Sequence, residues 1–156
     1  MPKLDEFDLA ILSELQKNGR AANVDIAEAV HLSPSPCLRR IRNLEEQGVI
    51  RQRVALLDRE KVGLGVTVFA HVKLVAHGRD NLARFDQAIR RHPEVLECYT
   101  LMGDWDFLLR IVARDIKAYE AFFLDQLSKI PGIQSLSSSI AMTVVKETTQ
   151  LPLALR

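Results

Sequence analysis

Four side chains that suit nucleic acid lie within one short stretch of the sequence: Arg39, Arg40, Arg42 and Asn43. An arginine presents two parallel donors that fit a guanine edge or a phosphate, and an asparagine pairs with the edge of adenine. Further candidate contacts flank this group: Ser33, Ser35, Pro36 and Arg51. The pattern predicts a DNA-contacting surface. The solvated face of an ordinary helical bundle, which carries charge at similar density, is the alternative, and Arg51 is equally well an exposed strand residue.

A glycine and two aspartates make a second group of interest, Gly103-Asp104-Trp105-Asp106. They separate two apolar, strand-like runs. Gly-Asp-x-Asp is good turn chemistry, because glycine tolerates positive φ and aspartate hydrogen-bonds to its own backbone. The residues alone therefore predict a turn between two strands.

The histidines, cysteines and serines of this sequence lack the spacing that a metal site or a hydrolytic active site needs. The histidines form no i, i+4 pair and have no cysteine nearby: His31, His71, His77 and His92. Cys37 and Cys98 match no CxxC pattern, which indicates buried thiols in a reducing compartment. No G-x-S-x-G motif accompanies the serines at 137–139. We expect no metal, no cofactor and no catalytic residue.

Three helices are predicted over residues 5–17, 23–30 and 34–47, where apolar residues recur at helical spacing. Asn18-Gly19 would end the first helix in a left-handed conformation, Asn23 and Ser33 would cap the second and third, and Gly48 would close the third. A turn of three residues joins the second and third helices, which is typical of a helix-turn-helix.

The third helix is expected to have an apolar side and a polar side. At about 100° per residue, one side holds an apolar stripe that would dock on the other helices, consisting of Cys37, Leu38, Ile41 and Leu44. The opposite side carries Arg39, Asn43 and Glu46. Guanidinium and amide groups would therefore be exposed together on one surface.

The remaining sequence predicts a β-α-β-β-α-β order, the ferredoxin-like arrangement. Its strands and helices are expected at residues 67–75, 80–91, 95–102, 107–113, 115–129 and 135–146. Before them, residues 49–58 look like a strand or extended linker and 59–65 like a short helical turn. The predicted domains are a helix-turn-helix at 1–50, a hinge at 51–65, and an effector-binding and oligomerisation domain at 66–156.

Composition is that of an ordinary globular protein, with 47% hydrophobic and 26% charged residues and a formal net charge of +1. Positive charge is local to the third helix, which argues against broad nonspecific affinity for nucleic acid. The first residues are acidic where a signal peptide would be basic, and no apolar run approaches the length of a membrane span. We expect a cytoplasmic protein with no membrane partner.

Several segments resemble the Lrp/AsnC (leucine-responsive, feast/famine) transcription regulators. They are LDEFDLAILSELQKNGR (4–20), HLSPSPCLRRIRNLEEQGVI (31–50), VALLDREKVGLG (54–65), LMGDWDFLLRI (101–111) and AMTVVKETTQLPL (141–153). The resemblance implies an α+β fold, in which a winged-type helix-turn-helix is joined by a β hinge to a βαββαβ ferredoxin-like ligand-sensing domain. It also implies a homodimer or a tetramer of dimers.

The same resemblance implies that a small molecule, usually an amino acid, binds near the turn between the second and third strands. The positions that match are Thr100, Met102, Gly103, Asp104, Trp105 and Asp106. A backbone N–H at Gly103 would hold the α-carboxylate, and Asp104 or Asp106 would take the α-ammonium. Residues of the last strand from the facing chain would complete the pocket: Ser137, Ser139 and Ile140. Asp106 has an alternative structural role at the subunit interface.

The function expected is that of a regulator that binds double-stranded DNA and whose assembly or DNA affinity an amino acid alters. An enzyme is one alternative, because some proteins similar to this family work as tetrapyrrole decarboxylases. Those proteins rely on histidines in the sensing-type domain, whereas the histidines of this sequence are scattered and the arginine-bearing helix is kept. An architectural protein that coats DNA without an effector is the remaining alternative. Effector identity, target promoters and the sign of regulation stay open.

Overall fold

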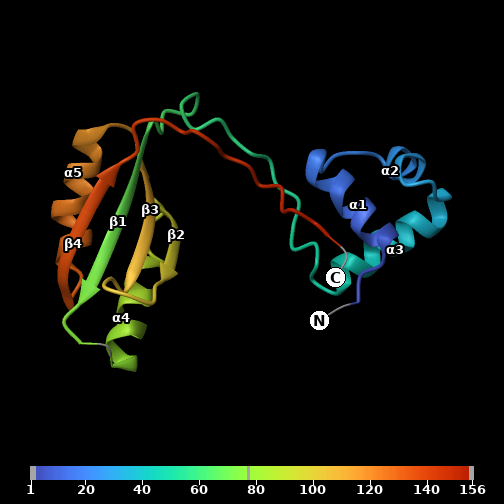
Figure 1. Cartoon of the computed structure of the whole chain (residues 1–156). Helices are drawn as coiled ribbons and strands as arrows, with labels where there is room; N and C mark the ends of the chain where they lie inside the picture. Colours follow the sequence, from blue (N-terminus) through green and yellow to red (C-terminus); the bar gives the residue numbers. More distant parts are fainter. Residues whose placement is uncertain (1–2, 77, 155–156) are drawn as a thin grey trace. The chain divides into compact units, whose positions relative to one another are not determined.

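The computed structural model describes residues 3–76 and 78–154 (Figure 1). The chain forms two compact units. One takes in the chain up to Leu56 together with the C-terminal segment from Lys146, and the other runs from Leu57 to Val145. The C-terminal segment, which the sequence places in the effector domain, thus packs with the N-terminal helices.

Three helices make up the N-terminal unit: α1 (Glu6–Lys17), α2 (Asn23–Ala29) and α3 (Pro34–Glu46). Asp5 starts α1 with a capping box, in which its side chain accepts from the Asp8 N–H while the Asp8 carboxylate accepts from the Asp5 N–H. The three predicted helices are confirmed.

The predicted caps are partly wrong. Ala22 occupies the N-cap of α2, and the Asn23 side chain instead donates to the Pro34 carbonyl at 2.8 Å. Ser33 occupies the N-cap of α3 but makes no capping hydrogen bond. Asn18 is extended rather than left-handed, whereas Gly48 does close α3 with a φ of 70°.

The core of this unit is a cluster of side chains from all three helices: Ile11, Leu12, Ile26, Ala27, Val30, Cys37, Ile41 and Leu44. Leu38 was expected in this core but is 38% exposed. It lies about 100° around the helix from Cys37, so it faces sideways while the i, i+4, i+7 stripe of Cys37, Ile41 and Leu44 faces inward. The described part of this unit holds no strand.

Residues 51–58 are extended but form no strand, because an extended segment needs a neighbouring strand to pair its N–H and C=O groups. The helical turn expected at 59–65 is present. It starts at Asp58, whose side chain accepts from the N–H groups of Glu60 and Lys61.

The second unit is built on a four-stranded antiparallel sheet of order β2-β3-β1-β4. Its strands are β1 (Val66–Leu74), β2 (Val95–Thr100), β3 (Phe107–Ala113) and β4 (Ile133–Ile140). Two helices, α4 (Arg79–Ile89) and α5 (Ile116–Asp125), and a 3-10 turn, η1 (Leu127–Lys129), complete it. The βαββαβ order and the α+β class are confirmed.

Two predicted elements run four or more residues too far at their C-terminal ends. β4 stops at Ile140, which pairs with Val68, and one further bond follows from the Ala141 N–H to the Thr67 carbonyl. Because β1 begins at Val66, it offers no partner to residues beyond 142. The helix expected at 115–129 ends at Asp125. Continued helix would place the polar Gln126 on the same side as Tyr119 and Phe122, and the break exposes Gln126 while burying Leu127.

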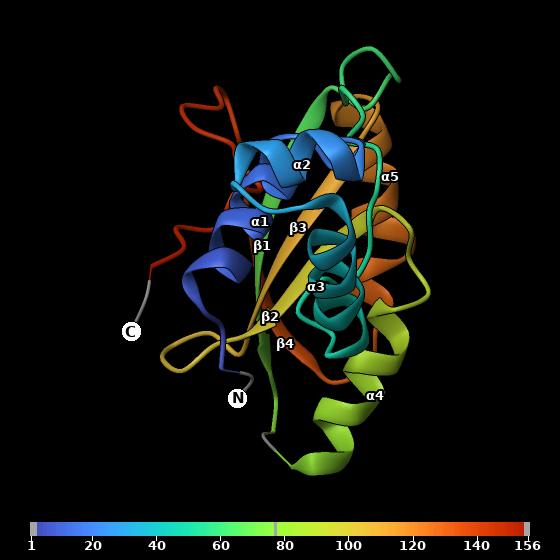
Figure 2. The same ribbon diagram turned by 90° about the vertical axis from the view of Figure 1, so that its right-hand side faces the viewer.

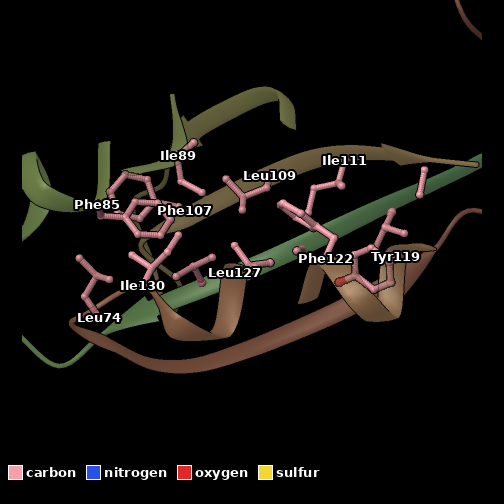
Figure 3. Close-up of a cluster of buried hydrophobic side chains, with 14 residues drawn as sticks. Leu74, Phe85, Ile89, Phe107, Leu109, Ile111, Tyr119, Phe122, Leu127 and Ile130 are labelled. Atoms are coloured by element: carbon pink, nitrogen blue, oxygen red, sulfur yellow. The ribbon is translucent and has the colours of Figure 1, made fainter. Parts of the chain in front are cut away.

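One sheet face packs against α4 and α5 and the other is open. The packed face buries alternate residues of β1, together with Leu109 and Ile111 of β3 and aromatic side chains of both helices (Figure 3). The open face includes Phe69 and Tyr99, both exposed. No helix in the described ranges is long and apolar enough to cross a membrane.

Candidate functional site

The outward side of α3 is the first candidate site. Burial of Cys37, Ile41 and Leu44 against α1 and α2 fixes the rotation of the helix. That rotation exposes five side chains suited to a DNA groove, Ser35, Leu38, Arg39, Arg42 and Asn43. Leu38 was assigned to the core by sequence reasoning, and its apolar side chain suits contact with a thymine methyl group.

Arg39 and Arg42 are the cations available on this surface. Within residues 3–76 and 78–154, neither has an ion-pair or hydrogen-bond partner. An unpaired, exposed guanidinium keeps all its donors for an external acceptor such as a guanine edge or phosphate. The surface can therefore bind an anion without first breaking an internal contact.

Arg40 is in a different situation from its neighbours. Its Nη1 lies 2.8 Å from Asp5 Oδ2 and 2.8 Å from Asp8 Oδ1, and the guanidinium lies over the Phe7 ring at 5.4 Å. The hydrogen bond to Asp8 raises the pKa of Arg40. This guanidinium, expected on the DNA surface, thus joins α3 to the start of α1.

The remaining predicted DNA contacts lie around the start of α3 and in the linker. Ser33 is exposed and Pro36 half-buried, both in the first turn or at its cap. The Asn23 amide holds the Pro34 carbonyl, which orients this end of the helix. Arg51 is exposed, whereas nearby Arg53 pairs with Glu45 at 2.9 Å.

The turn between β2 and β3 is the second candidate site. The Leu101 N–H donates to the Asp106 carbonyl at 2.8 Å and closes the turn. Gly103 has a φ of 144°, a conformation that side chains rarely adopt. Several of the predicted ligand positions are exposed here: Thr100, Met102, Gly103 and Asp104.

Asp106 ties this turn to β1. Its carboxylate accepts from the Leu74 N–H at 2.7 Å, and its own N–H donates to the Val72 carbonyl at 2.9 Å. These bonds are within one chain, so the structural role of Asp106 does not require a subunit interface. Asp104, by contrast, is exposed at the tip.

Trp105 connects the turn to the open face of the sheet. Its ring lies 5.6 Å from that of His71, and His71 is the cross-strand partner of Ser137. Ser139 pairs with Phe69 two residues further along the same face. Ile140, expected in the same pocket, pairs with the core residue Val68, so it lies on the opposite face and is 44% exposed at the strand end. A single chain thus brings Trp105, His71 and Ser137 into one row. Sequence reasoning missed His71, although alternation along β1 would have placed it beside Phe69.

The described residues contain no cluster of three or more His, Cys, Asp or Glu side chains that would hold an ion. Both cysteines, Cys37 and Cys98, are free thiols.

Two family models cover most of the chain. A winged helix-turn-helix DNA-binding model matches residues 4–51, and a Lrp/AsnC ligand-binding-domain model matches residues 67–151. The chain belongs to the Lrp/AsnC family. The boundary between the two matched regions falls in the extended segment and turn that precede β1.

Relatives in this family are similar over nearly their whole length. The transcriptional regulator AzlB of Bacillus subtilis is 39% identical over 150 residues, 96% of either chain. The leucine-responsive regulatory protein of Klebsiella pneumoniae is 36% identical over 98% of this chain and 93% of its own. A crystal structure of a Neisseria meningitidis transcriptional regulator in complex with L-Met has a TM-score of 0.91 and 44% identity, covering 96% of each chain. This Lrp/AsnC chain is therefore a DNA-binding transcriptional regulator with a ligand-binding domain.

Proposed function

We propose that this protein binds double-stranded DNA through the outward side of α3, and that an amino acid bound near the β2–β3 turn alters its DNA affinity or assembly. DNA binding is supported above all by the exposed guanidinium groups of Arg39 and Arg42 beside Asn43, which have no partner among the described residues. Together they supply donors for guanine, adenine and phosphate. Such a regulator acts in the cytoplasm, where it meets DNA.

Two copies are needed for specific binding. A dimer places two recognition helices in successive major grooves about 34 Å apart. The open sheet face supports self-association, because it exposes Phe69 and Tyr99 and because the buried Nε of Arg110 has no hydrogen-bond partner in the described part of the chain. A second copy covering this face would exclude water from the rings and bring its β4 serines near the turn. Association of four such dimers would give a tetramer of dimers.

The effector site combines the turn with the open face. The Gly103 N–H and neighbouring amides receive the carboxylate of the amino acid, and the exposed Asp104 receives its ammonium. Asp106 braces the turn, since its carboxylate is already bonded to Leu74. Trp105, Met102, Ser137 and Ser139 surround the side chain of the effector, whereas Ile140 faces the other side of the sheet and lies outside this site. L-methionine and L-leucine are the first amino acids to test, because relatives are named for an L-Met complex and for leucine response.

The test is isothermal titration calorimetry with each amino acid on the wild type, Asp104→Asn and Asp25→Asn. Asp25 is an exposed carboxylate on α2 and serves as the matched control. Loss of binding in Asp104→Asn alone supports the site. Equal binding by all three proteins contradicts it.

A further inference from the structure

One side chain holds the C-terminal segment on the first helix. Gln16, in the last turn of α1, accepts a hydrogen bond from the Leu151 N–H at 2.6 Å and donates one to the Leu151 carbonyl at 3.2 Å. The two residues are 135 positions apart in the sequence. Figures 1 and 2 both show the red C-terminal segment reaching the helices of this unit.

The chemistry of this contact is that of strand pairing. A carboxamide carries the same donor and acceptor as a peptide group, and an extended residue turns its N–H and C=O to the same side. Gln16 therefore pairs with Leu151 as a neighbouring β-residue would. Pro152 favours the required backbone, because a residue that precedes proline avoids the α region.

The other end of the segment is anchored to the sheet. The Ala141 N–H donates to the Thr67 carbonyl of β1 at 2.9 Å, directly after β4 ends. The ten residue steps from Ala141 to Leu151 span about 35 Å at most, and the twenty steps of the covalent linker from Glu46 to Val66 span about 70 Å. With its end held by Gln16, the tail is thus the shorter of the two connections. It therefore limits the separation of the two units more than the covalent linker does.

We propose that Gln16 is the positioning residue of a second tether, which runs from β4 to α1 and limits where the helix-turn-helix can lie relative to the sheet. A restricted volume raises the effective concentration of the second recognition helix of a dimer once the first has bound. The tail continues from the strand that carries Ser137 and Ser139. The DNA consequence of the tether rests on the proposed function, whereas the clamp itself does not.

The clamp is tested by hydrogen–deuterium exchange of the full-length protein, followed by mass spectrometry of the tail peptide. We expect Gln16→Ala to speed exchange of the peptide that contains Leu151 by about tenfold, the scale of one net hydrogen bond, with α1 peptides unchanged. Gln16→Glu keeps the acceptor and loses the donor, so its rate falls in between. Gln87→Ala, an exposed glutamine on α4, is the matched control and leaves the tail unchanged. Tail exchange equal to wild type in Gln16→Ala overturns the clamp.

The tether is tested by fluorescence anisotropy with DNA that holds two half-sites and DNA that holds one. Gln16→Ala is expected to lose affinity several-fold for two half-sites and to keep wild-type affinity for one, a difference that damage to α3 would not produce. A chain that ends at Thr149 gives the same loss, and combining both changes adds nothing, because each change already removes the contact between Gln16 and Leu151. Faster tail exchange with unchanged affinity for two half-sites overturns the tether. If the wild-type protein fails to distinguish DNA sequences, the proposed function is contradicted. The exchange data still show, independently of DNA binding, whether Gln16 holds the tail.

Discussion

Arg40 Nη1 lies 2.8 Å from Asp8 Oδ1 and joins the third helix to the first turn of α1. The Asp8 side chain is 15% exposed, so this pair is better shielded from solvent than most surface ion pairs. One arginine of the basic stretch is consequently used for packing, while Arg39 and Arg42 point outward. The division of roles within one helix leads to the first prediction.

Arg40→Ala should reduce stability, whereas Arg39→Ala should reduce DNA affinity. Loss of the ion pairs and of the contact with Phe7 is expected to lower the free energy of unfolding by about 1 kcal/mol. Loss of a base contact at Arg39 should weaken specific binding by about 1–3 kcal/mol without changing stability. Urea denaturation and anisotropy measure the two effects, and Arg84→Ala on α4 is the control. An Arg40→Ala protein of normal stability that binds DNA as poorly as Arg39→Ala would reverse the assignment.

Asp106 and Asp104 should separate into a structural and a ligand-binding residue. Asp106→Ala removes the acceptor for the Leu74 N–H and should destabilise the sheet by about 1–3 kcal/mol. Asp106→Asn keeps an oxygen acceptor and should recover most of that loss. Thermal unfolding measures both proteins. Equal stability of the alanine variant and the wild type would refute the bracing role.

The ion pair between Glu97 and Arg110 should make the sheet sensitive to acid. The hydrogen bond from Arg110 lowers the pKa of Glu97 from its ordinary value of 4.5. A lowered folded pKa contributes stability that is fully present above pH 4.5 and is lost as the pH falls through the folded value. The pair is partly exposed, so the contribution is less than about 1 kcal/mol. Denaturation at pH 6 and pH 3 should differ less in Glu97→Gln than in wild type, and an unchanged difference would contradict the prediction.

The two cysteines should react by different routes. Partial burial of the thiol raises the pKa of Cys98 to about 11, and the nearby Asp86 carboxylate adds to this shift. The residue as a whole is nevertheless exposed. Its alkylation should therefore increase through pH 11 rather than near 9. Cys37 is fully buried in the helical core and should react only when that unit opens. Iodoacetamide labelling of Cys37→Ser and Cys98→Ser measures each thiol alone, and rapid native labelling of Cys37 would show that the core is looser than described.

Periodicity and turn chemistry were sufficient to predict the order of elements. Helical spacing located α1 to α3, and alternating β-branched residues located the strands. Individual contacts across the fold were not predictable in this way. Nothing local to Arg40 indicates that Asp5 and Asp8 meet it, because that depends on how α1 and α3 cross. The pairing of Gln16 with Leu151 is equally hidden by its 135-residue separation.

The predictions of a buried Leu38 and of a strand that continues to residue 146 are wrong for the same reason, because both rest on local sequence alone. Leu38 was assigned to the core by its hydrophobicity, whereas its angle of about 100° from Cys37 decides its exposure. The segment 141–146 contains β-branched residues, yet β1 starts at Val66 and therefore offers no partner for most of this segment. Local propensity predicts an element, and the available partner decides where it ends.

Amino-acid control of DNA binding is tested most simply by fluorescence anisotropy on DNA from upstream of the protein's own gene and on scrambled DNA, at one fixed salt concentration. Each titration is repeated with saturating L-methionine or L-leucine. We expect preferential binding to the upstream DNA and a change in that affinity with one of the amino acids. Equal, weak binding to both DNAs that neither amino acid alters would contradict it.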